Sequence, residues 1–471
     1  MPAVKTVVIA GATGFVGIAL AKRLVGEFRV IGLTREDSQR LRREGIEWRY
    51  CDLFSLMQCE RALEGADLAC YLVHSMLPSA RLTQGTFQDM DLIIADNFAR
   101  AATRAGIRHI VYLGGLVPEA AELSSHLRSR LEVERALGSR GVPVTALRSG
   151  IVVGQGGSSY RMFKTLVERL PIIPCPRWAD SLTQPVALPD VLDLVRYCLR
   201  HPSSRSRSCD IGSPDIMSYR ELLRRTAAVL GLKRLFVRVP ITGSTVCRYW
   251  LSWVTRSPMD LIVPLLESIR HPMVARDRGL QKEAGIPGLT FEEAVRRAVE
   301  EERGSIPDDP ARPERSAQRR MARLKLRQDV RSVQRMRLPA GKNARWAAER
   351  FLRWLPQYFR FLFRAETAPG GHIRFVLGSA KLCLLELALA ADRSGGSDRQ
   401  VFYVVGGLLA KAESRKTRRA RLEFRTVLGG QYLLAAIHDY RPSLPWRIYA
   451  ATQATVHLRV MNSFARHLET Y

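Results

Sequence analysis

Three glycines near the amino terminus are spaced for chemistry on a phosphate group. They occur in the run Gly-Ala-Thr-Gly-Phe-Val-Gly over residues 11–17, directly after the apolar residues 7–10. In a strand–loop–helix unit the first glycine permits a tight turn, the second lets the backbone approach a pyrophosphate, and the third lets the helix pack closely. The N–H groups at the helix start then bind the anion. The predicted contacts of this nucleotide loop are Gly11, Thr13, Gly14, Phe15, Val16 and Gly17.

The end of the next apolar run, residues 29–34, indicates which dinucleotide is bound. At this place an acid would bind the ribose 2′-hydroxyl of NAD. Thr34 and Arg35 stand there instead, and a hydroxyl beside a guanidinium suits a 2′-phosphate. The sequence therefore favours NADP(H). Glu36 and Asp37 follow directly and keep NAD as the alternative.

Further candidate residues follow other expected strands. Asp52 and Leu53 come after the third strand, where Asp52 can bind an adenine amino group. His74 follows the apolar run 66–73, and Gly114 ends the strand expected over 107–115. Because ligands bind at the carboxyl ends of strands in open α/β sheets, all four are expected at the cofactor crevice.

The elements that position these residues alternate between strand and helix over about the first 150 residues. This alternation predicts an α/β fold with a parallel, doubly wound sheet. The length of 471 residues predicts two or three domains. The eight cysteines lack a Cys-x-x-Cys pair, which argues against a zinc site or a disulfide framework. Without a signal-peptide pattern at the amino terminus, a cytoplasmic protein is expected.

Three motifs together resemble short-chain dehydrogenase/reductase proteins. They are residues 11–17, Tyr-Leu-Gly-Gly-Leu at 112–116, and Leu-Arg-Ser-Gly-Ile-Val-Val-Gly at 147–154. The resemblance is closest to the atypical branch, which includes NmrA-like regulators and the NAD(P)-binding accessory subunit of respiratory complex I. It implies a Rossmann domain over residues 1–302, with a substrate lobe over about 155–302.

The catalytic positions depart from what this resemblance implies. The family has a serine after strand five and a Tyr-x-x-x-Lys pair on the next helix. Here Gly114 or Gly115 takes the serine place, and His126 with Arg130 keeps the spacing of the pair. Arginine stays protonated and cannot transfer a proton, and its charge keeps His126 neutral. Two alternatives stay open: His126 is the proton donor, or the pair only positions the cofactor, which we favour.

The segment after residue 302 is strongly basic. The chain carries 73 Lys and Arg against 45 Asp and Glu, a net charge of +28. Residues 303–342 are interpreted as a linker, and its arginine-rich part, 312–337, can form a basic helix on an anionic membrane. A solvated linking helix is the alternative. Specific nucleic-acid binding is not expected, because no aromatic reading element accompanies the charge.

The last segment, residues 343–471, is interpreted as a separate α+β domain. Strand-like runs occur between an aromatic helix near residue 346 and one long helix over about 446–468. This order resembles the helix-grip fold of lipid-transfer and cyclase proteins, which implies an apolar cavity or a filled core.

Three functions are compatible with these patterns. The favoured one is an NADP(H)-binding oxidoreductase-like protein that acts on, or senses, an apolar small metabolite. Trp250, Trp253 and the apolar face of Leu261, Leu265 and Ile269 can line its substrate site, or can be core. The alternatives are a non-catalytic redox sensor or scaffold, and a lipid or quinone carrier with a structural cofactor. An oligomer is compatible with each of them.

Overall fold

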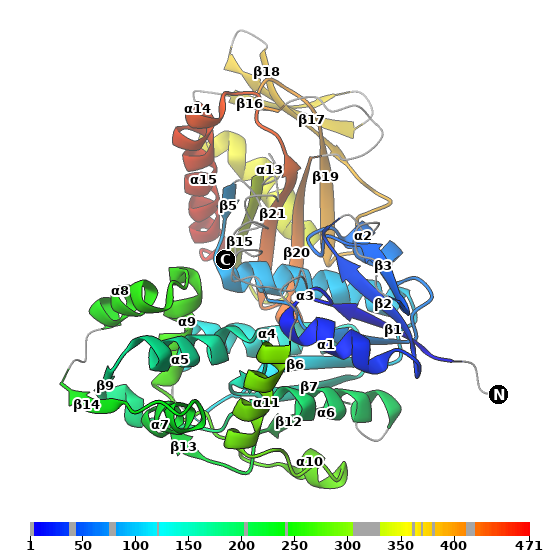
Figure 1. Cartoon of the computed structure of the whole chain (residues 1–471). Coiled ribbons are helices and arrows are strands. Elements are labelled where there is room, and N and C mark those ends of the chain that lie inside the picture. Colours follow the sequence, from blue (N-terminus) through cyan, green and yellow to red (C-terminus); the bar gives the residue numbers. More distant parts are fainter. Residues whose placement is uncertain are drawn as a thin grey trace. The chain divides into compact units, whose positions relative to one another are not determined.

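The chain forms two compact units in the computed structural model (Figure 1). The structure describes residues 4–36, 44–74, 82–119, 122–201, 206–240, 244–304, 330–359, 363–368, 371–378, 382–410 and 420–471. The N-terminal unit comprises Met1–Met76 and Ile94–Ser316, and the C-terminal unit comprises Leu77–Ile93 and Ala317–Tyr471. The boundary between them falls inside one helix, α3 (Phe87–Arg104).

A parallel seven-stranded sheet forms the centre of the N-terminal unit, as the sequence predicts. Its strand order is β12-β7-β6-β4-β1-β2-β3, and the order reverses between β1 and β4. All five residues of β1 are buried, as expected for a parallel strand covered on both faces. The strands are β1 (Thr6–Ala10), β2 (Arg29–Thr34), β3 (Ile46–Tyr50), β4 (Leu68–Tyr71), β6 (Ile110–Gly115), β7 (Val144–Ser149) and β12 (Arg207–Ile211).

Helices cover this sheet and bury one stripe each. In α1, for example, Leu20, Ala21 and Leu24 recur at helical spacing and are buried in the core under the sheet. Besides α3, the helices associated with the sheet are α1 (Phe15–Leu24), α2 (Leu56–Leu63), α4 (Ser125–Gly138), α6 (Leu188–Arg200) and α10 (Gly279–Glu283).

A second core in the same unit forms the lobe expected over about 155–302. It is built by α5 (Ser158–Arg169), α7 (Tyr219–Val229), α8 (Ser244–Thr255), α9 (Met259–Ile269) and α11 (Phe291–Gly304). Short strand pairs complete it: β8 (Val152–Val153) with β11 (Val186–Ala187), β9 (Ile172–Pro176) with β14 (Leu235–Val239), and β10 (Leu182–Thr183) with β13 (Met217–Ser218), beside the 3-10 turn η2 (Arg177–Asp180).

The C-terminal unit is an α+β fold with an eight-stranded sheet. Its strand order is β16-β17-β18-β19-β20-β21-β15-β5. The strands are β5 (Leu82–Gln84), β15 (Val330–Arg337), β16 (Phe363–Ala368), β17 (His372–Leu377), β18 (Leu382–Leu389), β19 (Arg399–Gly406), β20 (Arg421–Val427) and β21 (Tyr432–Tyr440), with the turn η6 (Leu428–Gly430) between the last two. Aromatic residues of α13 (Ala344–Tyr358) and α15 (Gln453–Leu468) pack with Phe424 of the sheet in one core.

The structure corrects three expectations about the segments that form the C-terminal unit. The predicted basic helix over 312–337 is wrong for its last eight residues, which form β15 because the sheet satisfies their backbone between β21 and β5. The rest of that segment, 312–329, lies outside the described residues. The single helix over about 446–468 is instead two helices, α14 (Trp446–Ala451) and α15, separated at Thr452.

The third correction concerns β5, which was expected to belong with the first 302 residues. β5 pairs in parallel with β15 at the edge of the C-terminal sheet. The Gln84 amide donates to the Ala454 carbonyl oxygen at 2.9 Å, and Arg335 donates to Asp89 at 2.7 Å. These contacts agree with the assignment of Leu77–Ile93 to the C-terminal unit.

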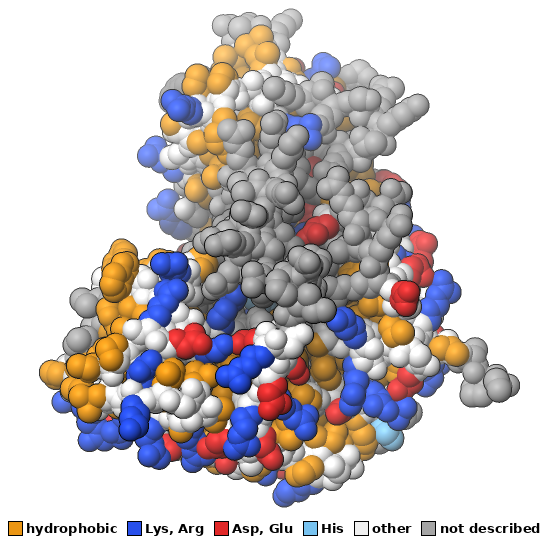
Figure 2. Space-filling model, viewed as in Figure 1, with side chains coloured by type: hydrophobic (Ala, Val, Ile, Leu, Met, Phe, Trp, Pro, Cys, Tyr) orange, Lys and Arg blue, Asp and Glu red, His pale blue; other side chains and the backbone are white. Residues whose placement is uncertain are grey.

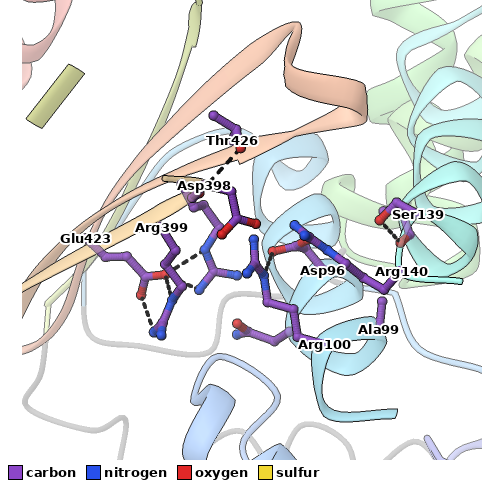
Figure 3. A network of polar contacts seen from close by, with 12 residues as sticks. Asp96, Ala99, Arg100, Ser139, Arg140, Asp398, Arg399, Glu423 and Thr426 are labelled. Atoms are coloured by element: carbon purple, nitrogen blue, oxygen red, sulfur yellow. Dashed lines mark hydrogen bonds and ion pairs between the residues drawn. The ribbon is translucent and has the colours of Figure 1, made fainter. Parts of the chain in front are cut away.

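Each unit contains a buried ion-pair cluster, shown in Figure 3. In the N-terminal unit Asp96 accepts hydrogen bonds from Arg100 at 2.8 Å and from Arg140 at 3.1 Å, which joins α3 to the residues before β7. In the C-terminal unit Arg399 donates to Glu423 at 2.6 Å across β19 and β20. Buried carboxylates are thus paired with arginine in both units. None of the helices in the described segments is long and apolar enough to cross a membrane.

Candidate functional site

The glycine loop between β1 and α1 forms a close-fitting cradle. Gly11 has a φ of +88°, which favours glycine, and the Gly14 amide donates to the Gly11 carbonyl oxygen at 2.9 Å. A Cβ on Gly17 would overlap with that same oxygen. The helix therefore starts directly against the turn, as predicted.

The start of α1 offers its N–H groups without competition from a side chain. The N-cap residue is Gly14, which supplies no capping oxygen, and the first turn contains no acidic residue. An anion at this position would be stabilised by unpaired N–H groups and by the helix dipole. The glycine loop and the N–H groups at the start of α1 therefore fit the pyrophosphate of a dinucleotide. Ala12 beneath it is fully buried, and Thr13 is half-buried.

Phe15 and Val16 have packing contacts that the sequence did not predict. A Cβ on Gly154 would stand 3.1 Å from the Phe15 ring, and one on Gly157 would do the same. The Phe15 ring therefore lies against the backbone that follows β8. Val16 packs against the core under the sheet. Both residues therefore pack against the protein, and this packing holds the glycine loop in position.

At the end of β2 the structure separates the roles of Thr34 and Arg35. The Thr34 side chain is buried, and its hydroxyl accepts a hydrogen bond from the Glu36 amide at 3.0 Å. Thr34 therefore shapes the turn. Arg35 is exposed, and no ion pair holds it within the described part of the chain. The guanidinium is thus available for an incoming phosphate.

Asp52 and Leu53 lie at the end of β3 in a tight turn. The Asp52 carboxylate is buried and accepts a hydrogen bond from the Phe54 amide at 3.3 Å. The Leu53 carbonyl oxygen accepts one from Asn97 of α3 at 2.8 Å. These contacts fix the turn at the edge of the sheet next to β2. Whether Asp52 also binds adenine stays a prediction.

On the other side of the order reversal, the structure brings His74, His126 and Arg130 together. His74 lies two residues after Leu72, just beyond the end of β4. A Cβ added to Gly11 would stand 3.1 Å from the Leu72 carbonyl oxygen, so this segment packs closely against the glycine loop. His126 and Arg130 lie one turn apart on α4. The Arg130 charge acts on both histidine rings, and His74 acts on His126.

The pKa of each histidine is lowered from its ordinary value. The surrounding protein atoms and then the Arg130 charge lower the pKa of His74, although this residue stays exposed to solvent. Burial, Arg130 and His74 lower the pKa of His126 to about 3. This arrangement agrees with the predicted neutral His126, but burial contributes more to it than the Arg130 charge that the sequence indicated.

Gly114 and Gly115 end β6 beside Arg130, and the two positions differ. A Cβ on Gly114 would stand 2.8 Å from the ring of the buried Tyr112. On Gly115 its nearest atom would be the Arg130 Cγ at 3.5 Å, an ordinary van der Waals contact. The Tyr112 hydroxyl also donates to the Arg130 carbonyl oxygen at 3.2 Å. The sequence named Gly114 or Gly115 for the serine place, but it gave no role to Tyr112, although Tyr112 belongs to the motif 112–116.

The expected substrate-lining residues are mostly core or surface. Trp250 and Leu265 pack against the lobe core, in which Ile269 is buried. Trp253 is 80% exposed on α8, and Tyr249 is 67% exposed. Figure 2 shows apolar and basic side chains interspersed on this face of the lobe. The side chain of Leu261 lies outside the described residues.

Comparisons with known proteins agree with the cradle. A family model described as NAD(P)H-binding matches residues 11–166. The chain is 29% identical over 110 residues to the auxiliary protein GraX of Staphylococcus aureus. That match covers 23% of this chain and 36% of GraX, so the chain spans about a third of the length of this relative.

Solved structures share the fold of the N-terminal unit. Triphenylmethane reductase of Citrobacter sp., complexed with NADP(H), gives a TM-score of 0.51 at 18% identity over 62% of this chain and 100% of its own. The NADPH-dependent quinone oxidoreductase of Escherichia coli, complexed with NADPH, gives 0.50 at 18% over 61% and 98%. A nucleoside-diphosphate-sugar epimerase of Staphylococcus aureus gives 0.50 at 13% over 62% and 99%. The N-terminal unit is therefore an NAD(P)H-binding domain of Rossmann type.

Proposed function

We propose that the N-terminal unit binds NADPH in preference to NADH and acts as an oxidoreductase on an apolar metabolite. The observation that carries the proposal is the cradle at Gly11, Gly14 and Gly17, in which a side chain would take the space next to the helix start. Bound NADPH would supply a hydride. This chain's own residues would hold the phosphates and orient the reactive half.

The preference for NADPH rests on Arg35. The guanidinium is exposed at the end of β2, on a turn that the Thr34 hydroxyl fixes. A 2′-phosphate would gain a charge-assisted hydrogen bond there, worth about 1.5–3 kcal/mol. NADH carries no such phosphate and would gain nothing from Arg35.

An apolar substrate is proposed from the lobe and from structures of the same fold. The lobe supplies a large apolar core beside the strand ends, which includes Tyr160, Phe163 and Leu251. The solved proteins of this fold include a reductase of triphenylmethane dyes and a quinone oxidoreductase. Their substrates motivate quinones and conjugated aromatic compounds as first probes.

A non-catalytic redox sensor is the second candidate, and the site around Gly114 favours it. No hydroxyl is present at Gly114, and the ring of Tyr112 occupies the space that a side chain would need. His126 is neutral and so is a poor acid. Protonation of a substrate would then depend on solvent, or no turnover would occur.

For the C-terminal unit we propose a helix-grip-like fold whose core is filled by side chains. Its helices α13 and α15 contact each other through Phe351 and Phe464, whose ring centroids are 5.0 Å apart. Phe351 also lies 5.3 Å from Phe424. This aromatic packing favours a filled core over a carrier cavity.

The decisive experiment is stopped-flow oxidation of protein-bound NADPH. The full chain is mixed with a panel of quinones, enones and aldehydes. Oxidation that saturates with one class supports the oxidoreductase. Tight NADPH binding without oxidation by any class supports the sensor, and failure of NADPH to bind refutes both.

A further inference from the structure

Arg130 is a largely buried arginine, and no carboxylate among the described residues pairs with its guanidinium. Its exposed fraction is 9%, and in the described residues its guanidinium has neither a hydrogen bond nor an ion pair. Other arginines of this unit are paired: Arg148 contacts Glu134 at 2.7 Å, and Arg100 contacts Asp96 at 2.8 Å. A buried charge without a partner is costly.

The sequence around the site does not supply the missing carboxylate. Residues 75–81, which follow His74, and residues 120–121, which precede α4, contain neither aspartate nor glutamate. The neighbouring groups are the neutral rings of His74 and His126. These rings donate and accept hydrogen bonds, but they leave the net charge of the cluster at that of one arginine.

The cluster lies where the reactive half of a dinucleotide is expected. In this fold the ligand crosses the strand ends at the order reversal, with its adenine half on the β2 side. Here β1 and β4 flank the reversal, and β6 is the next strand. His74 follows β4, and Arg130 lies beside Gly115 at the end of β6.

We infer that Arg130, with His74 and His126 beside it, binds an anionic oxygen of the substrate, most simply a carboxylate on an otherwise apolar molecule. This inference rests on the proposed function for the position of the cofactor. The ribose hydroxyls of the cofactor are uncharged, so binding them would leave the Arg130 charge unneutralised. An anion neutralises it and gains a charge-assisted hydrogen bond.

The test compares two probes of the same shape and different charge. Benzoate and benzamide are titrated calorimetrically into the full chain, first alone and then saturated with NADPH. Benzoate is expected to bind roughly 10- to 100-fold more tightly than benzamide in both states. If benzoate and benzamide bind with equal affinity, both without and with NADPH, the inference is overturned.

Three variants assign the effect to Arg130. Arg130→Gln is expected to abolish the preference for benzoate, and Arg130→Lys to keep most of it. Arg128→Gln removes the same charge from an exposed position on the same helix and is expected to change nothing. If Arg128→Gln reduces the benzoate preference as much as Arg130→Gln does, the preference arises from the general positive charge of the helix, and a specific site at Arg130 is refuted. If Arg130→Gln fails to fold, the Lys variant still decides: loss of the benzoate preference in this folded, charged variant contradicts the inference.

A final arm separates the substrate from the cofactor as the source of the anion. Inorganic phosphate is added as a competitor with and without NADPH. If the benzoate preference disappears once NADPH is bound, a cofactor phosphate occupies Arg130 and the inference is wrong. Because benzoate is also tested on the chain alone, failure of NADPH to bind refutes only the proposed function.

Discussion

The hydroxyl of Tyr112 donates a hydrogen bond to the backbone oxygen of Arg130 at 3.2 Å. Tyr112 belongs to the inner strand β6, and Arg130 belongs to α4. One side chain thus connects the sheet to the helix that carries both candidate catalytic residues. The same ring occupies the space next to Gly114 in which a serine would have to stand.

The Tyr112 hydrogen bond predicts a stability effect. Tyr112→Phe keeps the ring and removes only the hydroxyl, so the buried connection between β6 and α4 is lost. The free energy of unfolding is expected to fall by about 0.5–1.5 kcal/mol in urea titrations. An unchanged midpoint would mean that the bond contributes nothing to folding.

Cofactor choice is predicted to depend on Arg35. Arg35→Ala is expected to weaken NADPH binding by roughly 10- to 100-fold and to leave NADH binding unchanged, measured by fluorescence titration. Arg29→Ala is the control, because Arg29 is an exposed arginine at the opposite end of the same strand. Equal affinities for the two cofactors in the parent protein would refute the role of Arg35.

The cradle predicts that Gly17 does not tolerate even a methyl group. In Gly17→Ala the new Cβ would overlap with the Gly11 carbonyl oxygen, so α1 must shift away from the turn. We expect stability to fall by about 1–3 kcal/mol and NADPH binding to be lost.

The control is Gly304→Ala at the end of α11, where a Cβ meets no atom within 4 Å. NADPH binding that survives Gly17→Ala would contradict the close fit of loop and helix.

The cradle and the sheet were predictable because their signals are local. Glycine spacing fixes a turn, and buried strands of the parallel sheet are continuous apolar runs, so β1, β2 and the start of α1 follow from sequence alone. The pairing of His126 with Arg130 on one helix was predicted from their spacing. The position of His74 beside this pair was not predicted, since it depends on which strands are neighbours.

The edge of the C-terminal sheet was not predictable for a different reason. β5 has only three residues, Leu-Thr-Gln, and precedes a helix of the N-terminal half. Its pairing with β15 joins segments far apart in sequence, and β15 is so rich in arginine that its pattern suggested a helix. Edge pairing over such a distance leaves no local periodicity to find.

The neutral state of His126 predicts a flat pH response. Because the pKa is lowered to about 3, the ring is expected to stay neutral between about pH 5.5 and 8. His126→Asn is therefore expected to leave NADPH affinity and any turnover within about twofold.

The measurement is the pH profile of NADPH oxidation, with histidine chemical shifts as an independent check. If the parent's turnover falls as pH rises through 6–7 and His126→Asn removes that dependence, His126 is the proton donor after all.

His438 in the C-terminal unit predicts loss of stability in acid. Its side chain is buried on β21, with its Nε2 atom 3.5 Å from the Glu423 carboxylate. Burial and the charge of Arg421 lower the pKa of His438 to about 4, while Glu423 opposes the shift. In the unfolded chain the pKa is about 6.5. Between these two values the unfolded state binds more protons than the folded state.

The free energy of unfolding must therefore fall as pH decreases from about 6.5 to 4. The contribution of His438 is expected to be about 1–3 kcal/mol. His438→Gln removes the titrating group, so its stability should depend less steeply on pH in this window, measured by urea unfolding at several pH values. His201→Gln, at an exposed position after α6, should keep the parent's slope. If both variants keep that slope, His438 takes up its proton as readily when folded as when unfolded, and the argument from its burial fails.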